Sequence, residues 1–158
     1  MALPSFITTD IEKWLSSFSF FTTIRPRFSE TDAFGHVNNI SYFTYFEQAR
    51  LDYFANLGLI EPLLNSLEKS MVVTANLECH YLAQLFYGQT IEVYVRTAKI
   101  GRSSFELEYA IVEKDEKSIV AVGRGTIVHI NKTANRSEEL PDFVRSAIRE
   151  FENYPLLG

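Results

Sequence analysis

Residues 39–58, NISYFTYFEQARLDYFANLG, carry the most informative pattern in this 158-residue sequence. Apolar side chains recur there at intervals of three and four, which is the period of one helix face. The members of this face are Tyr42, Phe46, Ala49, Tyr53 and Leu57. Two further aromatic residues, Phe43 and Phe54, stand beside it. The pattern predicts a helix from Asn39 to Leu57, ended by Gly58. Because the helix is apolar over more than one stripe, we expect other structure to surround most of it.

After this helix the sequence changes to alternation of apolar and polar residues. Alternating stretches run over 73–81, 91–96 and 105–111, and a last long strand is expected over 119–130. The connections between these stretches are short, which predicts antiparallel pairing. A helix this apolar needs a sheet that curls around it, so the sequence predicts an α+β fold.

Shorter elements are expected before and after this central part. Phe20–Phe28 is rich in Phe, Thr and Ile and predicts a strand, which Pro26 should restrict to an edge or a bulge. Thr9 and Glu12 have the spacing of a capping box, which predicts a short N-terminal helix. Pro141 predicts the start of a C-terminal helix. The expected apolar face of that last helix consists of Phe143, Val144, Ala147, Ile148 and Phe151.

Composition limits the class of protein. No repeat, linker or composition shift divides the chain, so we expect one domain over 1–158, with 1–19 as an N-terminal extension. No apolar run approaches the roughly 20 residues that cross a bilayer, which predicts a cytoplasmic protein without a membrane partner. The net charge of −5 argues against nucleic-acid binding. The single cysteine, Cys79, excludes an intrachain disulfide and a cysteine-based metal cluster.

Residues 29–39, SETDAFGHVNN, form the most function-like run and stand directly before the predicted helix. A helix start has unpaired N–H groups and a partial positive charge, so it can stabilise a carbonyl oxygen that becomes negative. A carboxylate held beside it, such as Asp32, can attack that carbonyl or activate a water molecule. This arrangement would suit acyl transfer.

The same run also has a purely structural interpretation, which its composition alone favours. Polar residues before a helix are usually caps and turn formers, and Asn38 or Asn39 is a good N-cap. His36 by itself is more typical of a loop-holding residue than of a proton carrier. No second histidine or carboxylate stands at metal-ligand spacing, so we expect no metal site.

A family resemblance adds to this pattern. Thr31–Asn39 resembles the signature Asp-x-x-Gly-His-Val-Asn-Asn of the 4-hydroxybenzoyl-CoA thioesterase family, and the residues that continue the match along the helix are Tyr42, Tyr45, Phe46, Glu47, Ala49 and Arg50. The similarity extends from Phe20 to Pro141. It implies a hotdog fold, in which a five-stranded antiparallel sheet wraps the long helix and short helices stand at both ends. It also implies a homodimer or homotetramer with active sites at the subunit interface.

The resemblance implies an acyl-CoA thioesterase that needs no cofactor. Asp32 would act as nucleophile or general base, in a catalytic segment that includes His36. The backbone N–H groups of Val37, Asn38 and Asn39 would polarise the thioester carbonyl. Two alternatives stay open: an acyl-ACP thioesterase, which the net charge weakly disfavours, and a non-catalytic module that binds acyl thioesters. The acyl group itself is not specified.

Substrate contacts are expected at two places. A CoA thioester carries phosphates, which suit a turn that offers basic side chains, hydroxyls and backbone N–H groups. The candidate turn residues are Lys99, Gly101, Arg102, Ser103 and Ser104. A solvated hairpin turn explains this composition equally well. The aromatic stripe of the helix is expected to be mostly core, and Tyr42 and Phe46, which stand nearest the catalytic segment, are its candidates for lining the acyl site. The N-terminal extension lies outside the resemblance, and we expect it to cover a sheet edge or alter the acyl pocket.

Overall fold

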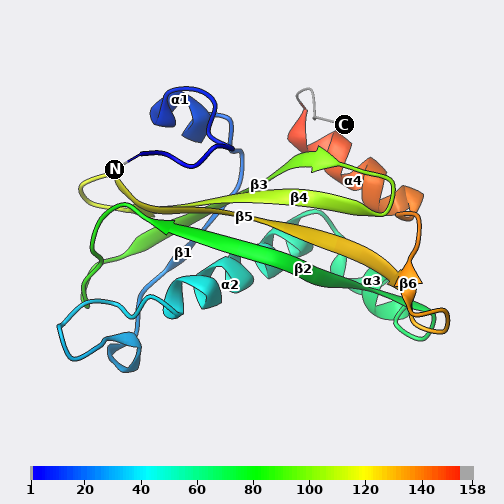
Figure 1. Ribbon diagram of the computed structural model, residues 1–158, viewed down its shortest axis with the longest axis horizontal. Helices are drawn as coiled ribbons and strands as arrows, with labels where there is room; N and C mark the ends of the chain where they lie inside the picture. Colours follow the sequence, from blue (N-terminus) through cyan, green and yellow to red (C-terminus); the bar gives the residue numbers. More distant parts are fainter. Residues whose placement is uncertain (1, 154–158) are drawn as a thin grey trace.

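A computed structural model describes residues 2–153 of the chain, which form one antiparallel sheet with helices on both faces (Figure 1). In sheet order the strands are β1 (Phe21–Ile24), β3 (Ile91–Ile100), β4 (Ser104–Glu113), β5 (Ser118–Asn131) and β2 (Ser70–Tyr81), and the short β6 (Arg136–Ser137) pairs with β5. The helices are α1 (Ile11–Leu15), α2 (Ser41–Asn56), α3 (Ile60–Asn65) and α4 (Asp142–Glu152). No helix within these residues is long and apolar enough to cross a membrane.

The predicted α+β fold is confirmed, with α2 along the inner face of a curved sheet (Figure 1). The sheet has one strand more than the five expected, because the chain turns back after β5 and forms β6. Helix α3 is a further element that the sequence pattern does not predict. Gly58, with a φ of 72°, ends α2 as expected, and the short apolar segment after it forms α3.

The aromatic face of α2 makes the core. Its buried residues are Tyr42, Tyr45, Phe46, Ala49, Tyr53 and Phe54. The ring of Phe46 stacks on Tyr109 of β4 with centroids 4.6 Å apart. A Cβ on Gly123 of β5 would lie 2.7 Å from this Phe46 ring, so glycine at that position lets the helix approach the sheet closely. The burial of α2 therefore depends on a small residue in the sheet as well as on the helix pattern.

The two edges of the sheet differ in length. β1 is an edge strand, as Pro26 predicted, but it ends at Ile24, so the strand is shorter than the expected Phe20–Phe28. The other edge is the twelve-residue β2, which pairs with β5 along one side only and has an irregularity between Thr74 and Asn76. A long edge strand of this kind can pair with another chain.

Helix α1 packs on the outer face of the sheet, opposite α2 (Figure 1). Asp10, rather than the predicted Thr9, caps it: Asp10 Oδ1 accepts hydrogen bonds from the N–H groups of Glu12 and Lys13 at 3.0 and 3.3 Å. An aspartate carboxylate at this position is a strong cap, so the threonine hydroxyl is not needed.

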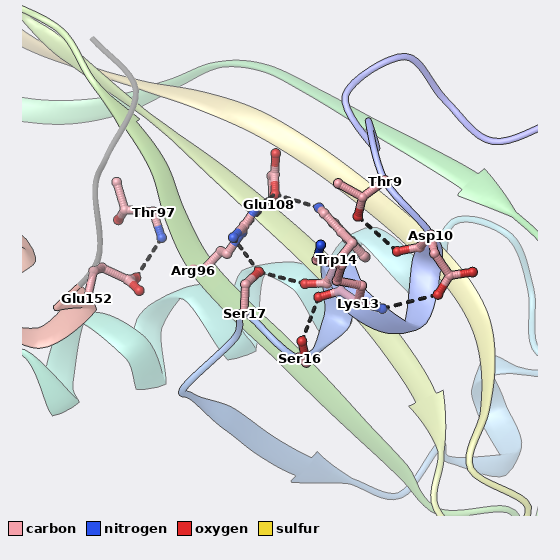
Figure 2. A network of polar contacts seen from close by, with 10 residues as sticks. All are labelled: Thr9, Asp10, Lys13, Trp14, Ser16, Ser17, Arg96, Thr97, Glu108 and Glu152. Atoms are coloured by element: carbon pink, nitrogen blue, oxygen red, sulfur yellow. Dashed lines mark hydrogen bonds and ion pairs between the residues drawn. The ribbon is translucent and has the colours of Figure 1, made fainter.

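A buried polar network attaches this N-terminal extension to the sheet (Figure 2). Glu108 of β4 is 4% exposed, and its Oε2 accepts from Trp14 Nε1 at 2.8 Å. The same oxygen accepts from Arg96 Nε and Nη2 at 2.8 and 2.6 Å, and Arg96 Nη1 donates to Ser17 Oγ. The extension therefore covers the outer face of the sheet and not a sheet edge, and its effect on the acyl pocket stays a prediction.

Helix α4 closes one end of the core. Pro141 is its N-cap, and Val144 and Ile148 are buried, as predicted. Phe143 is 40% exposed, so its place on the apolar face was wrong. The buried Glu152 of α4 accepts from the Tyr53 hydroxyl at 2.5 Å and from the Thr97 N–H at 2.8 Å. Burial, with this carboxylate next in effect, raises the pKa of Tyr53 far above its ordinary value.

Candidate active site

The loop before α2 folds into a tight turn centred on Asp32 and His36. Asp32 N–H donates to the His36 carbonyl at 2.8 Å, and Gly35 N–H donates to the Asp32 carbonyl at 3.2 Å. Gly35 has a φ of 81°, a conformation that other residues rarely adopt. The His36 ring lies edge-on to Phe86, with centroids 5.2 Å apart. Its backbone and ring thus hold the turn against the segment before β3.

The two carboxylate oxygens of Asp32 have different surroundings. Oδ1 accepts hydrogen bonds from the N–H groups of Phe34 and His36, at 2.8 and 3.2 Å. Within residues 2–153 nothing donates a hydrogen bond to Oδ2, and the side chain is half-buried. The structural and the chemical interpretations of this aspartate are therefore compatible: one oxygen shapes the turn and the other is open for chemistry.

The three predicted carbonyl-binding amides also differ. The Val37 N–H donates to the Leu85 carbonyl and the Asn38 N–H donates to the Glu30 carbonyl, both at 2.7 Å. Those two amides hold the loop in place and are not open to a ligand in this structure. Only the Asn39 N–H, among these three, has no acceptor in the part of the chain that the structure describes.

Asn39 is fixed at the entrance to α2 by its neighbours. Its carbonyl accepts a hydrogen bond from the Tyr81 hydroxyl of β2 at 2.7 Å. Asn38 Oδ1 accepts from the Ile40 N–H at 3.0 Å and so caps the turn that leads into the helix. The N-cap of α2 is Ile40, whose side chain makes no capping hydrogen bond. The prediction that Asn38 or Asn39 is the N-cap was therefore wrong.

A groove begins immediately after Asn39, between α2 and the edge strand β2. We call it the α2 groove; its volume is about 260 Å³ and it is lined by Ile40, Phe43, Thr44, Glu47, Arg50, Thr74 and Leu77. Tyr42 and Phe46, expected to line the acyl site, are 3% and 0% exposed and belong to the core. Burial raises the pKa of Tyr42 to about 12.

The residues that line this groove are not among the predicted site residues. Ile40 is 68% exposed, and Phe43 is only partly buried beside the core. The available signal was limited to Ile40, an apolar residue outside the predicted apolar face, because Phe43 stands beside that face and resembles a core residue. Such exposed apolar side chains often mark a binding groove.

Comparison with known proteins identifies the family. Residues 26–148 match the model of the thioesterase-like superfamily. The chain belongs to this superfamily. The predicted family and enzyme class, a thioester hydrolase, are thereby confirmed.

Three relatives show the range of similarity to this thioesterase-like chain. The uncharacterized protein YsmA of Bacillus subtilis strain 168 is 35% identical over 142 residues, which cover 90% of this chain and 93% of that protein. A thioesterase from Thermus thermophilus, whose crystal structure is a complex with coenzyme A and zinc, is 31% identical, with a TM-score of 0.75 over 88% of this chain and 98% of that one. A 1,4-dihydroxy-2-naphthoyl-CoA thioesterase from Synechocystis is 17% identical and shares the fold, with a TM-score of 0.78 over 86% and 98%.

The candidate phosphate-binding turn of this thioesterase-like chain lies far from Asp32. The loop of Asp32 contacts Leu85 and Phe86, just before β3 begins, whereas Lys99–Ser104 stands where β3 ends. A ten-residue strand is about 33 Å long. One chain therefore does not bring these two groups of predicted site residues together.

Local hydrogen bonds also occupy the backbone of this turn. The Gly101 N–H donates to the Ser104 carbonyl at 2.7 Å. The carbonyls of Ser103 and Arg102 accept from His129 and Leu140 at 2.8 and 2.9 Å. Arg102 also lines a polar hollow of about 590 Å³ with Arg136. The turn thus anchors the C-terminal segment, and its basic side chain Arg102 borders that hollow.

Proposed function

We propose that the protein hydrolyses acyl-CoA thioesters to a free acid and CoA. The observation that carries this proposal is the pairing, in one loop, of an open carboxylate oxygen on Asp32 with an unused N–H on Asn39 at the start of α2. The α2 groove starts at the same place. The coenzyme A bound to the 31% identical Thermus thioesterase supports CoA as the carrier.

The chemistry follows from these two groups. The thioester carbonyl accepts a hydrogen bond from the Asn39 N–H, and the positive end of α2 stabilises the negative charge that develops on its oxygen. Asp32 either attacks the carbonyl carbon, giving an acyl-enzyme that water hydrolyses, or takes a proton from an attacking water molecule. In both routes the carbon–sulfur bond breaks, and the CoA thiolate leaves and is protonated. Tyr81 holds Asn39 in position.

A dimer would complete the site. The family resemblance implies pairing of two sheets edge to edge, and β2 is a long edge strand that suits such pairing. A two-fold axis beside β2 reverses the direction of the partner's sheet. The end of the partner that carries its own copy of the 99–104 turn would then lie on the side of the catalytic loop of the first protomer. In this proposal the CoA phosphates contact that turn across the interface.

Thiol release from a panel of short-chain, long-chain and aromatic acyl-CoAs tests the activity, with Asp32→Asn beside the wild type. An asparagine oxygen can still accept from Phe34 and His36, so the turn should persist while the carboxylate is lost. We expect kcat/KM to fall by about 10²- to 10⁴-fold. Glu30→Gln is the matched control, because Glu30 accepts from the Arg27 N–H in the same loop, at 2.6 Å.

The outcomes separate the alternatives. Loss of activity in Asp32→Asn together with nearly unchanged Glu30→Gln supports the proposal. Hydrolysis by Asp32→Asn at the wild-type rate would reject Asp32 as the catalytic carboxylate. Tight acyl-CoA binding without thiol release would indicate a binding module, and release only from acyl-ACP would change the carrier.

A further inference from the structure

A second cavity lies at the far end of α2 from the catalytic loop. It has a volume of about 240 Å³, is open to one side and is lined by residues of α2, α3 and the first half of β2, which lie side by side in Figure 1, and by Ile127 of β5. We call it the α3 cavity. Apart from Arg50 and Thr74, all the side chains that line it are apolar, among them Phe54, Leu63 and Met71. Its lining suits a hydrocarbon and offers almost nothing to a polar ligand.

The rim of the α3 cavity exposes large aliphatic side chains. Leu64 is 59% exposed, Leu51 is 45% exposed and Leu67 is 41% exposed, and all three line the cavity. Three such side chains around one opening form an apolar patch that a bound hydrocarbon would remove from water.

The α3 cavity continues the α2 groove. Arg50 and Thr74 line both, so the two hollows are neighbours that share this pair of side chains. Together they follow α2 from Asn39 to α3. Arg50 lies roughly 16 Å beyond Asn39 along the helix axis, by the rise of an α-helix. An extended hydrocarbon chain covers this distance with about a dozen carbon atoms, since its bonds are about 1.5 Å long and zigzag.

We propose that this track binds a straight, apolar acyl chain and that its terminal methyl end occupies the α3 cavity. The proposal rests on the thioesterase function above and names its substrate class: long-chain acyl thioesters, of about 14 to 18 carbons by the same bond geometry. Short or aromatic acyl groups end in the α2 groove and leave the α3 cavity to water.

The charged groups along the track are compatible with a neutral chain. Glu47 lies 4.0 Å from Arg50 Nη2, on the exposed side of the groove. The charge of Arg50 also acts inward on the buried hydroxyl of Tyr109, where it opposes the effect of burial, which raises the Tyr109 pKa. The methylene part of Arg50 is then the part that borders the chain.

The test measures kcat/KM for straight-chain acyl-CoAs of increasing length, together with benzoyl-CoA and a long chain that ends in a carboxylate. We expect each methylene group that enters the α3 cavity to raise kcat/KM about fourfold. Leu67→Trp should fill the cavity and lower kcat/KM about tenfold for the long chains, while the short chains are hydrolysed as by the wild type. The matched control is Leu3→Trp, since Leu3 is 40% exposed against 41% for Leu67 and does not line the cavity.

The outcomes distinguish this inference from the proposed function. Hydrolysis that is fastest with short, aromatic or carboxylate-ended groups would overturn the long-chain inference and leave the thioesterase function in place. An equal loss on all chain lengths in Leu67→Trp, or the same loss in Leu3→Trp, would also overturn it. Absence of thiol release from every thioester would overturn both.

Discussion

Two carboxylates, one on the outer face of the sheet and one in the loop before α2, have contrasting environments. Glu108, on the outer face, is 4% exposed and accepts hydrogen bonds from Trp14 and from two nitrogens of Arg96. Asp32, before α2, uses one oxygen for two backbone N–H groups and keeps the other free within the described chain. Within the described residues each carboxylate accepts through one oxygen, so the difference lies in burial and in the partner: Glu108 is buried and paired with the guanidinium of Arg96, which stabilises the fold, whereas Asp32 is half-buried, accepts only backbone N–H groups and stands beside a helix start, where it can react.

The largest effect on stability should come from removing the buried, ion-paired carboxylate of Glu108. Glu108→Ala removes the ion pair between Glu108 and Arg96, whose side chain is 14% exposed. It also removes the acceptor of the Trp14 side-chain N–H. Breaking a buried pair of this kind costs about 3 kcal/mol. We expect that decrease in the free energy of unfolding, measured by urea titration, with kcat/KM on the preferred thioester unchanged.

A matched variant sharpens this contrast. Glu106, two residues earlier on the same strand and face, is only partly buried, so Glu106→Ala should cost less than about 1 kcal/mol. Asp32→Asn should lower activity strongly and leave the unfolding free energy almost unchanged. A cost for Glu108→Ala no greater than for Glu106→Ala would show that the network does not hold the extension.

A smaller effect is expected on the other side of the same network. Trp14→Phe keeps an aromatic ring against Phe18, whose centroid lies 4.8 Å away, but removes the N–H that donates to Glu108. A hydrogen bond to a charged group contributes about 2 kcal/mol, and we expect a loss of that size in the urea titration. In the Glu108→Ala background the same substitution should cost clearly less. Equal costs in both backgrounds would mean that the two side chains act independently.

The fold was predictable from the sequence where the pattern is local. The stripe of α2 and the alternation in β2 to β5 repeat over many residues, so each element was identified correctly. Glu108 was not singled out, because it alternates like an outward polar residue. Its burial depends on the N-terminal extension, which folds back over that face from far away in the sequence.

The candidate site was predictable as a segment but not atom by atom. The motif located Asp32 and the helix start, yet which amide is free depends on the distant Leu85 and on Glu30. The Lys99–Ser104 turn has suitable chemistry for phosphate, but the length of β3 separates it from the loop. Contacts between segments distant in the sequence decide both points, and a single sequence does not contain them.

The smallest expected effect on activity concerns Tyr81 of β2, which contacts the start of α2. Its hydroxyl donates to the Asn39 carbonyl at 2.7 Å and so orients the peptide that presents the free N–H. Burial raises the pKa of Tyr81, so the hydroxyl stays protonated and able to donate throughout the neutral range. Tyr81→Phe removes one hydrogen bond of about 1 kcal/mol, which corresponds to about a fivefold lower kcat/KM if the bond positions Asn39 for catalysis.

Tyr87→Phe, on a 59% exposed tyrosine, is the control and should leave kcat/KM unchanged. An unchanged kcat/KM in Tyr81→Phe would mean that the start of α2 holds the Asn39 peptide in position without help from β2.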